Sequence, residues 1–256
     1  MTCIKTFDFS DLSTIEINAE MEGFQPRFDN TLALTAYQQQ TLILTREGQV
    51  IILNCRLQEC LNRFRRENGI CRHELNAYYS MAHCQTQAII SGHYRLVPTH
   101  GASNHQVVYY MAHHLDTYSY SRKLNRLLII LKGRVNLYQL RVDASFSSFG
   151  RILTAADQVA NLQLANIEDA MWRMGIYREH NGLRPASGTY LSHQQGLALH
   201  QRILANYAVA VTNEAFLAAF GELPGADFRR RLSSVIGYPG MPAKKDEKVI
   251  KQCSTD

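Results

Sequence analysis

Alternating apolar and polar positions predict a β-hairpin near residue 45, and helical spacings predict two helices after it. Two β-branched runs within residues 41–54 are separated by Arg46-Glu47-Gly48, which supplies a glycine for the positive-φ position of the turn. Between residues 56 and 83, apolar residues recur at helical spacing in two consecutive stretches. The two predicted helices should cover a sheet.

The apolar positions of each predicted helix gather on one face, which we expect to pack inward. Gly69 follows the first helix as the expected left-handed C-cap. The two faces consist of Leu57, Cys60, Leu61 and Phe64 in the first helix, and of Leu75, Tyr78, Tyr79 and Ala82 in the second.

Short extended segments follow, and turn residues between neighbouring segments favour an antiparallel meander. The polar stretch 116–125 is expected to be a loop. The segments comprise residues 88–90, 94–97, 107–111, 127–131 and 135–142. The predicted fold class is therefore α+β, with a small antiparallel sheet covered by two helices and followed by a helical C-terminal extension.

A long helical pattern begins at Thr154, where Thr154 and Asp157 resemble a capping box. Its apolar stripe runs along Ala160, Leu164, Ile167, Met171 and Met174. Docking on the chain's own sheet is the favoured explanation of this stripe, and a subunit interface is the alternative. For that interface, the candidate oligomerisation residues are Leu164, Ile167, Met171 and Met174.

Further signals divide the chain into segments. Residues 180–190 predict a linker, followed by a helix from Ser192 to about Tyr207 and a short helix from Thr212 to Gly221. Near the start of the chain, residues 1–36 alternate weakly, as at residues 14–18, and are expected to supply one strand. The predicted segments are an acidic N-terminal segment (1–36), a core (37–153), a helical C-terminal extension (154–236) and a disordered tail (237–256).

Composition indicates a globular, cytoplasmic protein. With 256 residues, of which 46% are hydrophobic, the chain can bury an ordinary core. It has no uninterrupted run of eighteen apolar residues and no charged-then-apolar N-terminus, so we expect neither a membrane segment nor a secretory signal. Its six cysteines are scattered, which suits reduced core thiols better than a disulfide framework.

The net charge of +5 is unevenly distributed, because basic residues dominate from Arg95 to Arg151. On the first predicted helix, Arg56, Arg63 and Arg66 fall on one flank, and Arg65 lies on the opposite shoulder. A guanidinium cluster of this kind suits an anionic partner, of which nucleic acid is the commonest, although a merely soluble surface explains the charge equally well. The candidate DNA-binding residues are Arg56, Arg63, Arg66, Arg72, Arg122, Lys123, Arg126, Lys132 and Arg134.

Motifs for catalysis, metals and cofactors are missing from the sequence. Its histidines and cysteines do not follow zinc-ligand spacing, and no glycine-rich phosphate loop or dinucleotide fingerprint is present. Cys60 lies on the buried stripe of a helix, where a thiol usually packs rather than reacts. We therefore predict a protein without enzyme activity, metal or cofactor.

Three motifs in the same order resemble the ComK-type family of competence transcription factors from Gram-positive bacteria. The first runs from Arg63-Phe64 through a short turn to Arg72 and Tyr78. Pro98-Thr99 and the following segment around Tyr109-Tyr110 match the second motif. The third is Ser145-Phe146-Ser147-Ser148-Phe149.

The likeness covers about residues 40–160 and implies that the core, residues 37–153, is a ComK-like DNA-binding region. This chain has Thr86-Gln87-Ala88 where the family carries a lysine and a proline, Tyr109 where tryptophan is favoured, and Cys71 where glycine is common. Loss of the lysine removes one phosphate contact and weakens the expectation of strong DNA binding.

The resemblance implies a transcriptional activator of DNA-uptake genes that assembles as a homo-oligomer on A·T-rich duplex DNA and reads mainly the minor groove. Arginines suit a narrow A·T minor groove, and lysines suit phosphates. We further expect a regulatory protease adaptor or RNA polymerase among its partners, and no membrane.

Two other functions compete with this hypothesis. An interaction protein without DNA binding would work through its helical C-terminal part and its acidic start. An RNA-binding protein would stack bases on exposed tyrosines, for which the candidates are Tyr78, Tyr79, Tyr109 and Tyr110, although such residues more often belong to a core.

Overall fold

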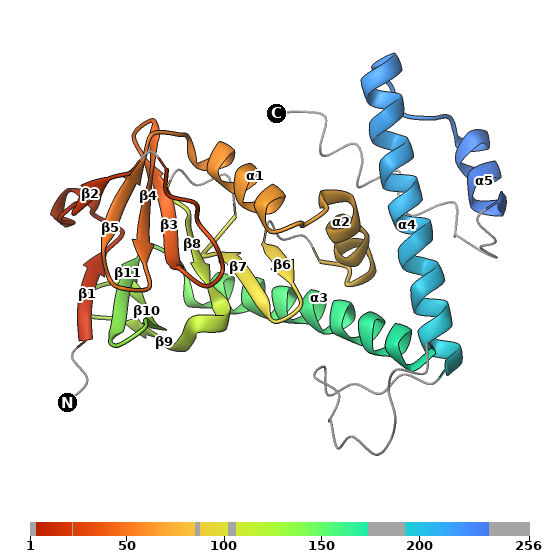
Figure 1. Ribbon diagram of the computed structural model, residues 1–256. Helices are drawn as coiled ribbons and strands as arrows, with labels where there is room; N and C mark the ends of the chain where they lie inside the picture. Colours follow the sequence, from red (N-terminus) through yellow and green to blue (C-terminus); the bar gives the residue numbers. More distant parts are fainter. Residues whose placement is uncertain (1–3, 22, 85–87, 102–105, 174–192, 236–256) are drawn as a thin grey trace. The chain divides into compact units, whose positions relative to one another are not determined.

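The computed structural model describes residues 4–21, 23–84, 88–101, 106–173 and 193–235 (Figure 1). The chain separates into two compact units, residues 1–191 and residues 192–256. Each unit is described by itself.

Most strands of the first unit belong to a seven-stranded sheet (Figure 1). All neighbouring strands in it are antiparallel except β2 and β5, which are parallel. Its order is β2 (Ala19–Glu20), β5 (Val50–Leu53), β4 (Gln40–Thr45), β3 (Thr31–Tyr37), β8 (Val108–Met111), β7 (Tyr94–Pro98) and β6 (Ile89–Ser91).

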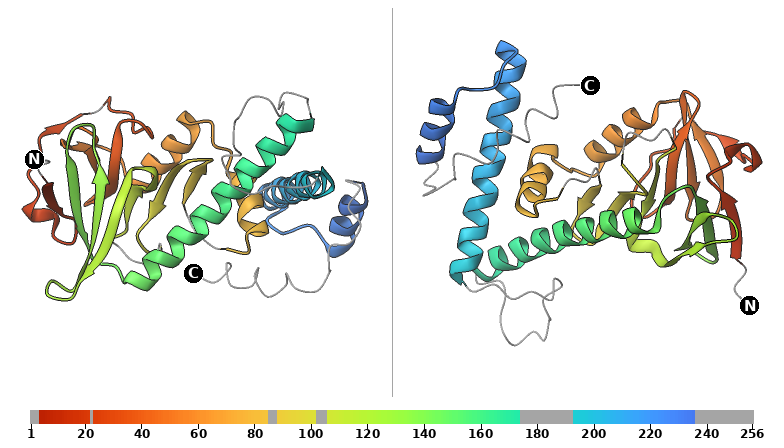
Figure 2. Two further views of the ribbon diagram at one scale, coloured as in Figure 1. Left: turned by 90° about the horizontal axis from the view of Figure 1, so that it is seen from below. Right: turned by 180° about the vertical axis from the view of Figure 1, so that it is seen from behind.

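A second sheet of four strands lies in the same unit (Figure 2). The N-terminal strand pairs in parallel with β11, and the other pairs are antiparallel. Its order is β1 (Ile4–Asp8), β11 (Leu137–Val142), β10 (Arg126–Lys132) and β9 (Leu115–Ser121). The α+β prediction is confirmed, although the β structure is larger than the small sheet expected.

Local signals explain the correct and the incorrect strand predictions. The β4–β5 hairpin is confirmed, and Gly48 has a φ of +83° in its turn. Residues 115–121 form β9 instead of a loop, because backbone pairing with β10 holds an edge strand whose side chains are mostly polar. Residues 1–36 contain strands, as predicted, but residues 14–18 are not one of them. Asp11 caps a short helical turn, η1 (Leu12–Thr14), by accepting from the Ser13 amide.

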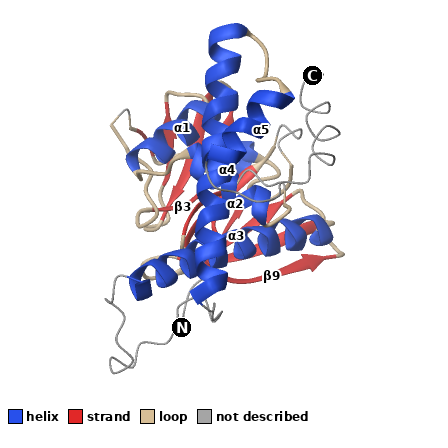
Figure 3. Cartoon of the chain, turned by 90° about the vertical axis from the view of Figure 1, so that its right-hand side faces the viewer, coloured by secondary structure: helices blue, strands red, loops and turns tan. Residues whose placement is uncertain are grey.

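Two helices, α1 (Leu57–Glu67) and α2 (Arg72–Met81), follow β5 as predicted. Helix α1 lies over β3 and β4 (Figure 3). It buries Cys60, Leu61 and Phe64 against them, and Leu57 is partly buried. The chain reverses at Gly69, whose φ of +65° matches the predicted left-handed position. The apolar stripe of α1 therefore forms one wall of the main core.

The opposite face of the seven-stranded sheet packs on the four-stranded sheet and on the start of α3 (Phe146–Arg173). Tyr109 belongs to the core cluster that contains Phe64. The side chain of the next residue points to the other face of the sheet, where Tyr110 stacks on Phe149 with 5.2 Å between ring centroids. Phe149 also contacts Tyr118 of β9. The seven-stranded sheet therefore separates α1 from the four-stranded sheet.

Helix α3 begins at Phe146 rather than at the predicted Thr154. The hydroxyl of Ser145 accepts a hydrogen bond of 3.2 Å from the Ser148 amide and so caps the first turn. The predicted boundary between residues 153 and 154 thus falls inside a helix. Residues 1–36 also contribute β1, β2 and most of β3 to the two sheets.

Buried polar contacts hold α3 on the β6–β7 hairpin, whose position under the helix is visible in Figure 2. The buried Gln163 side chain accepts from the Gly92 amide at 2.8 Å and donates to the Ile90 carbonyl at 3.3 Å. Arg95 forms an ion pair with Asp157. Docking of this helix on its own sheet, the favoured explanation of its apolar stripe, is confirmed for the segment around Gln163.

The second unit contains two described helices, α4 (His193–Phe220) and α5 (Ala226–Val235). The prediction of two helices separated before Thr212 is wrong, since nothing between Tyr207 and Thr212 breaks a helix. The rings of Phe216 and Phe228 join α4 to α5 at 4.9 Å between centroids. The linker predicted at 180–190 and the tail predicted at 237–256 lie outside the described residues.

One stretch among the described residues, Ile203–Phe220 of α4, is long and apolar enough to cross a membrane by length and composition alone. The sequence prediction missed it because polar residues such as Asn206 and Glu214 interrupt the apolar run. Length and composition do not distinguish a membrane helix from one that packs on protein.

Candidate nucleic-acid interface

Four candidate arginines surround the exposed side of α1 and the start of α2. Arg56 precedes α1, Arg66 lies in its last turn and Arg72 is the first residue of α2; all three are exposed. Among the described residues, these three make no ion pair. We call Arg56, Arg63, Arg66 and Arg72 the α1–α2 arginine face.

The fourth member of this face is partly neutralised. Arg63 is half-buried and lies 3.3 Å from the Glu59 carboxylate, one helical turn earlier. A solvent-accessible ion pair of this kind contributes at most about 1 kcal/mol to stability, so a phosphate can compete with Glu59 for the guanidinium. Arg63 therefore remains available to an anion.

Both helix starts lack a side-chain cap. Neither Arg56 nor Cys71, the residues that precede α1 and α2, accepts a hydrogen bond from the following amides through its side chain. The first amides of a helix are orphan donors that favour anions such as phosphate. Each helix therefore combines free amides with an exposed arginine at its start.

Arg65 points away from the α1–α2 arginine face, in agreement with its predicted position on the opposite side of the helix. Its guanidinium donates to Asn62 at 3.1 Å and lies close to Tyr79 and Tyr109. Burial lowers its pKa, although the two phenols oppose this effect. Arg65 serves packing between α1 and the sheet rather than an external ligand.

The five candidate basic residues from Arg122 to Arg134 do not form one surface. Arg122 and Lys123 are exposed in the β9–β10 turn, whereas Lys132 and Arg134 lie at the other end of β10. Seven strand residues separate the two ends by roughly 20 Å. Several members are also paired: Arg126 with Asp143 at 3.7 Å, Lys132 with Asp116 at 2.8 Å, and Arg134 with Glu47 at 3.6 Å.

The residues from Arg122 to Arg134 belong to β10 and its flanking turns in the four-stranded sheet, whereas α1 packs on β3 and β4 of the seven-stranded sheet. The candidate residues therefore belong to separate surfaces, and a straight duplex on one protomer would contact one of them.

The predicted oligomerisation stripe on α3 is divided by the docking of that helix. Leu164 is half-buried next to Gly92, whereas Ile167 is 51% exposed. Met171 is half-buried, and Met174 lies outside the described residues. The stripe is therefore not a continuous free surface.

The tyrosines considered for RNA binding are part of the interior. Tyr78, Tyr109 and Tyr110 are each 3% exposed or less, and burial raises the pKa of Tyr78 to about 12. The hydroxyl of Tyr79 donates to the Ala88 carbonyl. Their rings are not available to stack on bases.

The cysteines and histidines suggest two further chemistries, thiol nucleophilicity and metal binding. Burial raises the pKa of the Cys60 thiol to about 12, so this group is protonated and a poor nucleophile. Within the described parts of the chain, no three histidine, cysteine or acidic side chains gather as a metal site would require.

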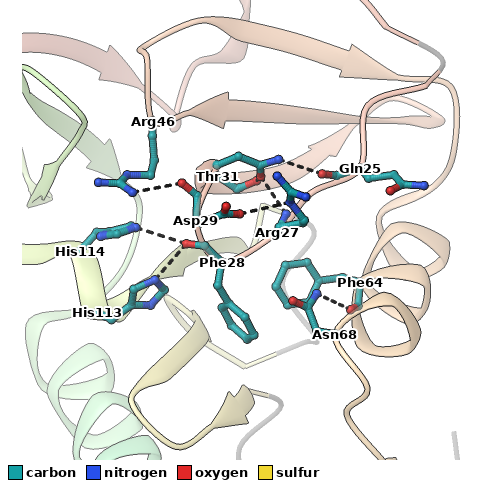
Figure 4. A network of polar contacts seen from close by, with 11 residues as sticks. Gln25, Arg27, Phe28, Asp29, Thr31, Arg46, Phe64, Asn68, His113 and His114 are labelled. Atoms are coloured by element: carbon teal, nitrogen blue, oxygen red, sulfur yellow. Dashed lines mark hydrogen bonds and ion pairs between the residues drawn. The ribbon is translucent and has the colours of Figure 1, made fainter.

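The sequence did not reveal a polar network that fixes the loop before β3 next to α1 (Figure 4). The Phe28 ring packs edge-on against the Phe64 ring, with 4.8 Å between ring centroids. The backbone carbonyl of Phe28 accepts hydrogen bonds from the imidazoles of His113 and His114 at 3.0 and 3.3 Å. Arg46 donates to the carbonyl of Asp29 at 3.1 Å. The two histidine contacts join segments 85 and 86 residues apart, so no local sequence pattern predicts them.

The same loop adds an exposed cation beside α1. Arg27 is mostly exposed and lies 3.2 Å from the Asp29 carboxylate. Because residues 1–36 are acidic on average, the charge pattern of the sequence does not single out Arg27. Its backbone is fixed because its amide donates to the Asn30 side chain at 2.8 Å.

The two histidines of this network are held neutral. The His113 Nδ1 atom accepts from the Arg95 amide, so its Nε2 atom carries the proton donated to Phe28. Burial lowers the pKa of both rings, that of His114 to about 4, and the nearby Arg46 acts in the same direction.

Acidification should therefore destabilise the protein. A folded pKa below the unfolded value of 6.5 means that the unfolded chain binds more protons, so stability is lost as pH falls from about 6.5 to 4. His114 should contribute on the order of 2 kcal/mol after allowance for solvent screening. Denaturant titrations of the parent and of His114→Gln, which keeps a donor, should diverge over this range. Parallel pH profiles would contradict the assignment.

Comparison with protein-family models, curated proteins and solved structures finds no match to this chain. The fold and the site define an α+β protein with an arginine-rich helical face. The ComK-type resemblance stays a prediction that rests on the three sequence motifs.

Proposed function

We propose that the protein is a sequence-selective transcriptional activator without catalytic activity, which binds A·T-rich duplex DNA through the α1–α2 arginine face. The observation that carries this proposal is a group of exposed arginines beside two uncapped helix starts, Arg56, Arg66 and Arg72, which have no acidic partner within the described part of the chain. Guanidinium groups suit the negative potential of a narrow minor groove, and free helix amides suit phosphates.

Helix α1 is held firmly in place by packing, which favours sequence-specific over non-specific DNA binding. Its buried stripe fixes α1 on β3 and β4, and the Phe28 loop fixes its C-terminal half. Contact groups held by packed elements present a defined geometry to a ligand. Competence genes as targets, a cytoplasmic location, and a protease adaptor or RNA polymerase as partners rest on the family resemblance alone.

Salt dependence tests the basic-face proposal. Neutralising one phosphate of B-DNA contributes about −0.9 to the slope of log affinity against log salt, so four arginines predict a slope of about −3.6 per protomer. Fluorescence anisotropy with A·T-rich duplex, G·C-rich duplex and single-stranded RNA at several salt concentrations gives this slope. Tightest binding to A·T-rich duplex is expected. A flat salt response would exclude the arginine face as the site, and preference for RNA would favour the RNA-binding alternative.

A protein-interaction role through the C-terminal helices is the second candidate function. One observation favours it: large apolar side chains of α4 and α5 are exposed, among them Leu217 and Phe220 at 48% and 68%. Under this function the arginine face would be a solvated surface, and DNA affinity would be low at physiological salt.

A further inference from the structure

The four-stranded sheet ends on one side in β9, a strand with an open outer edge. β9 pairs with β10 and is the last strand in the order of its sheet. Within the described residues, the backbone of residues 116–121 forms no hydrogen bond to any segment except β10. Alternate backbone groups of an edge strand point away from its neighbour. β9 therefore presents a row of unpaired donors and acceptors.

Exposed aromatic side chains lie beside this edge, where β9 runs next to α3 (Figure 3). The ring of Tyr118 in β9 contacts the ring of Phe146, the first residue of α3, with 5.3 Å between centroids. Phe146 is 48% exposed, and Tyr120 of β9 is 40% exposed. Unpaired backbone groups next to exposed rings are typical of an edge that associates with another strand.

Only an extended segment can complete this edge, because a helix uses its own backbone groups internally. The described residues of the second unit form the helices α4 and α5, which supply no such segment. The partner of β9 is therefore a strand, and the charges of β9 indicate which strand.

Opposite charges at the two ends of β9 make this strand complementary to itself. Asp116 lies near the start of β9, and the exposed Arg122 follows its last residue. The Asp116 carboxylate lies 2.8 Å from the Lys132 ammonium but keeps 35% of its side chain exposed. In an antiparallel pair of β9 strands with a two-fold axis at Ser119, Asp116 of each strand meets Arg122 of the other. Both ends of the pair then carry an attraction between opposite charges.

The side chains between the charges fit the same register. Thr117 of one strand lies opposite Ser121 of the other, and Tyr118 lies opposite Tyr120. Hydroxyl pairs and aromatic pairs both stabilise neighbouring antiparallel strands. A parallel pair in register would instead place Asp116 against Asp116, and like charges at such positions are destabilising.

We infer that a second copy of this chain pairs with the outer edge of β9, so that two protomers join their four-stranded sheets through an antiparallel β9–β9 contact. A strand from another protein could use the same backbone groups, but only a second β9 repeats both charges in the matching order. This edge replaces the α3 stripe as the oligomerisation surface. It does not depend on DNA binding.

Charge reversal in the full chain tests the contact. Arg122→Glu should raise the dimer dissociation constant about tenfold, because two attractive pairs become repulsive. Adding Asp116→Arg exchanges the two charges and should return the constant to within about threefold of the parent. Lys5→Glu reverses an exposed charge on β1, the opposite edge of the same sheet, and should leave the constant unchanged. Sedimentation velocity at micromolar concentration measures all four proteins, and circular dichroism checks that each is folded.

Cysteine cross-linking tests the register even if the charge variants unfold. Ser119→Cys lies opposite itself at the two-fold axis, where the Cα atoms of antiparallel strands are about 4.5–5.5 Å apart, within disulfide range. It should form a symmetric intermolecular disulfide under mild oxidation. Thr6→Cys, in the middle of β1, is the matched control and should cross-link no more than the parent.

Several results would overturn the proposal. A monomeric parent protein would mean that another segment of the chain or another protein occupies the edge. An unchanged dimer in Arg122→Glu, no recovery after the charge exchange, or equal weakening by Lys5→Glu would exclude the β9–β9 contact. So would a Ser119→Cys protein that cross-links no more than Thr6→Cys.

Discussion

Replacing Phe64 by alanine should lower the free energy of unfolding by about 3–5 kcal/mol, the usual cost of emptying a buried phenylalanine site. Phe64 is 1% exposed, and its ring packs edge-on against Phe28. The substitution therefore opens a cavity between α1, the sheet and the Phe28 loop. Urea denaturation followed by circular dichroism measures the loss.

Arg66, two residues further along α1, provides the control. Arg66→Ala removes an exposed side chain and should change the free energy of unfolding by less than about 0.5 kcal/mol. A silent Phe64→Ala together with a destabilising Arg66→Ala would mean that α1 packs with its opposite face toward the sheet.

Removing three cations from the α1–α2 arginine face should weaken duplex binding about 10²–10³-fold at moderate salt. The variant carries Arg56→Gln, Arg66→Gln and Arg72→Gln, and each lost contact to a charged group is worth roughly tenfold. Its thermal midpoint should hardly change, because the three side chains are exposed and unpaired among the described residues. The salt slope should also become shallower by about 2.7, which is three phosphates at 0.9 each.

A second triple variant distinguishes the loss of local contacts from the loss of net charge as the cause of weaker DNA binding. Arg122→Gln, Lys123→Gln and Arg134→Gln remove an equal number of charges from the two turns that flank β10 in the four-stranded sheet. If α1 and α2 hold the DNA, this variant should bind within about threefold of the parent, since distant exposed charges are screened. Equal losses in both variants would show that only the overall charge matters.

The sequence predicted those parts of the fold that local chemistry decides. Gly48 and Gly69 mark positions of positive φ, and the spacing of Cys60, Leu61 and Phe64 predicts the buried side of α1. These features depend on neighbours within one turn or hairpin, so a single sequence contains the necessary information.

Features decided by distant contacts were missed. β9 is recognisable only through its pairing with β10, and the start of α3 depends on the Ser145 cap and on Phe149 packing against Tyr110. Sequence reasoning also grouped Arg122 with Arg134, although the length of β10 separates them. Charge in a sequence does not disclose which residues share a surface.

The family motifs illustrate the same distinction. Phe64, Tyr78 and Phe149 are buried, and the Thr99 hydroxyl accepts from the Val108 amide at 3.3 Å. Buried residues and turns support a likeness in fold more directly than a likeness in function. The proposal of DNA binding therefore rests on the exposed arginines and needs a direct test.

Inosine substitution is the measurement that tests minor-groove binding of A·T-rich DNA most directly. Inosine·cytosine pairs lack the guanine amino group, so they present an A·T-like minor groove and a G·C-like major groove. Replacing the A·T pairs of a bound duplex by inosine·cytosine should cost less than about 1–3 kcal/mol of binding free energy, the usual cost of one misread base pair. Replacement by G·C should remove most of the specific binding. Equal loss of affinity on both substituted duplexes would contradict the account, because it would place the readout in the major groove.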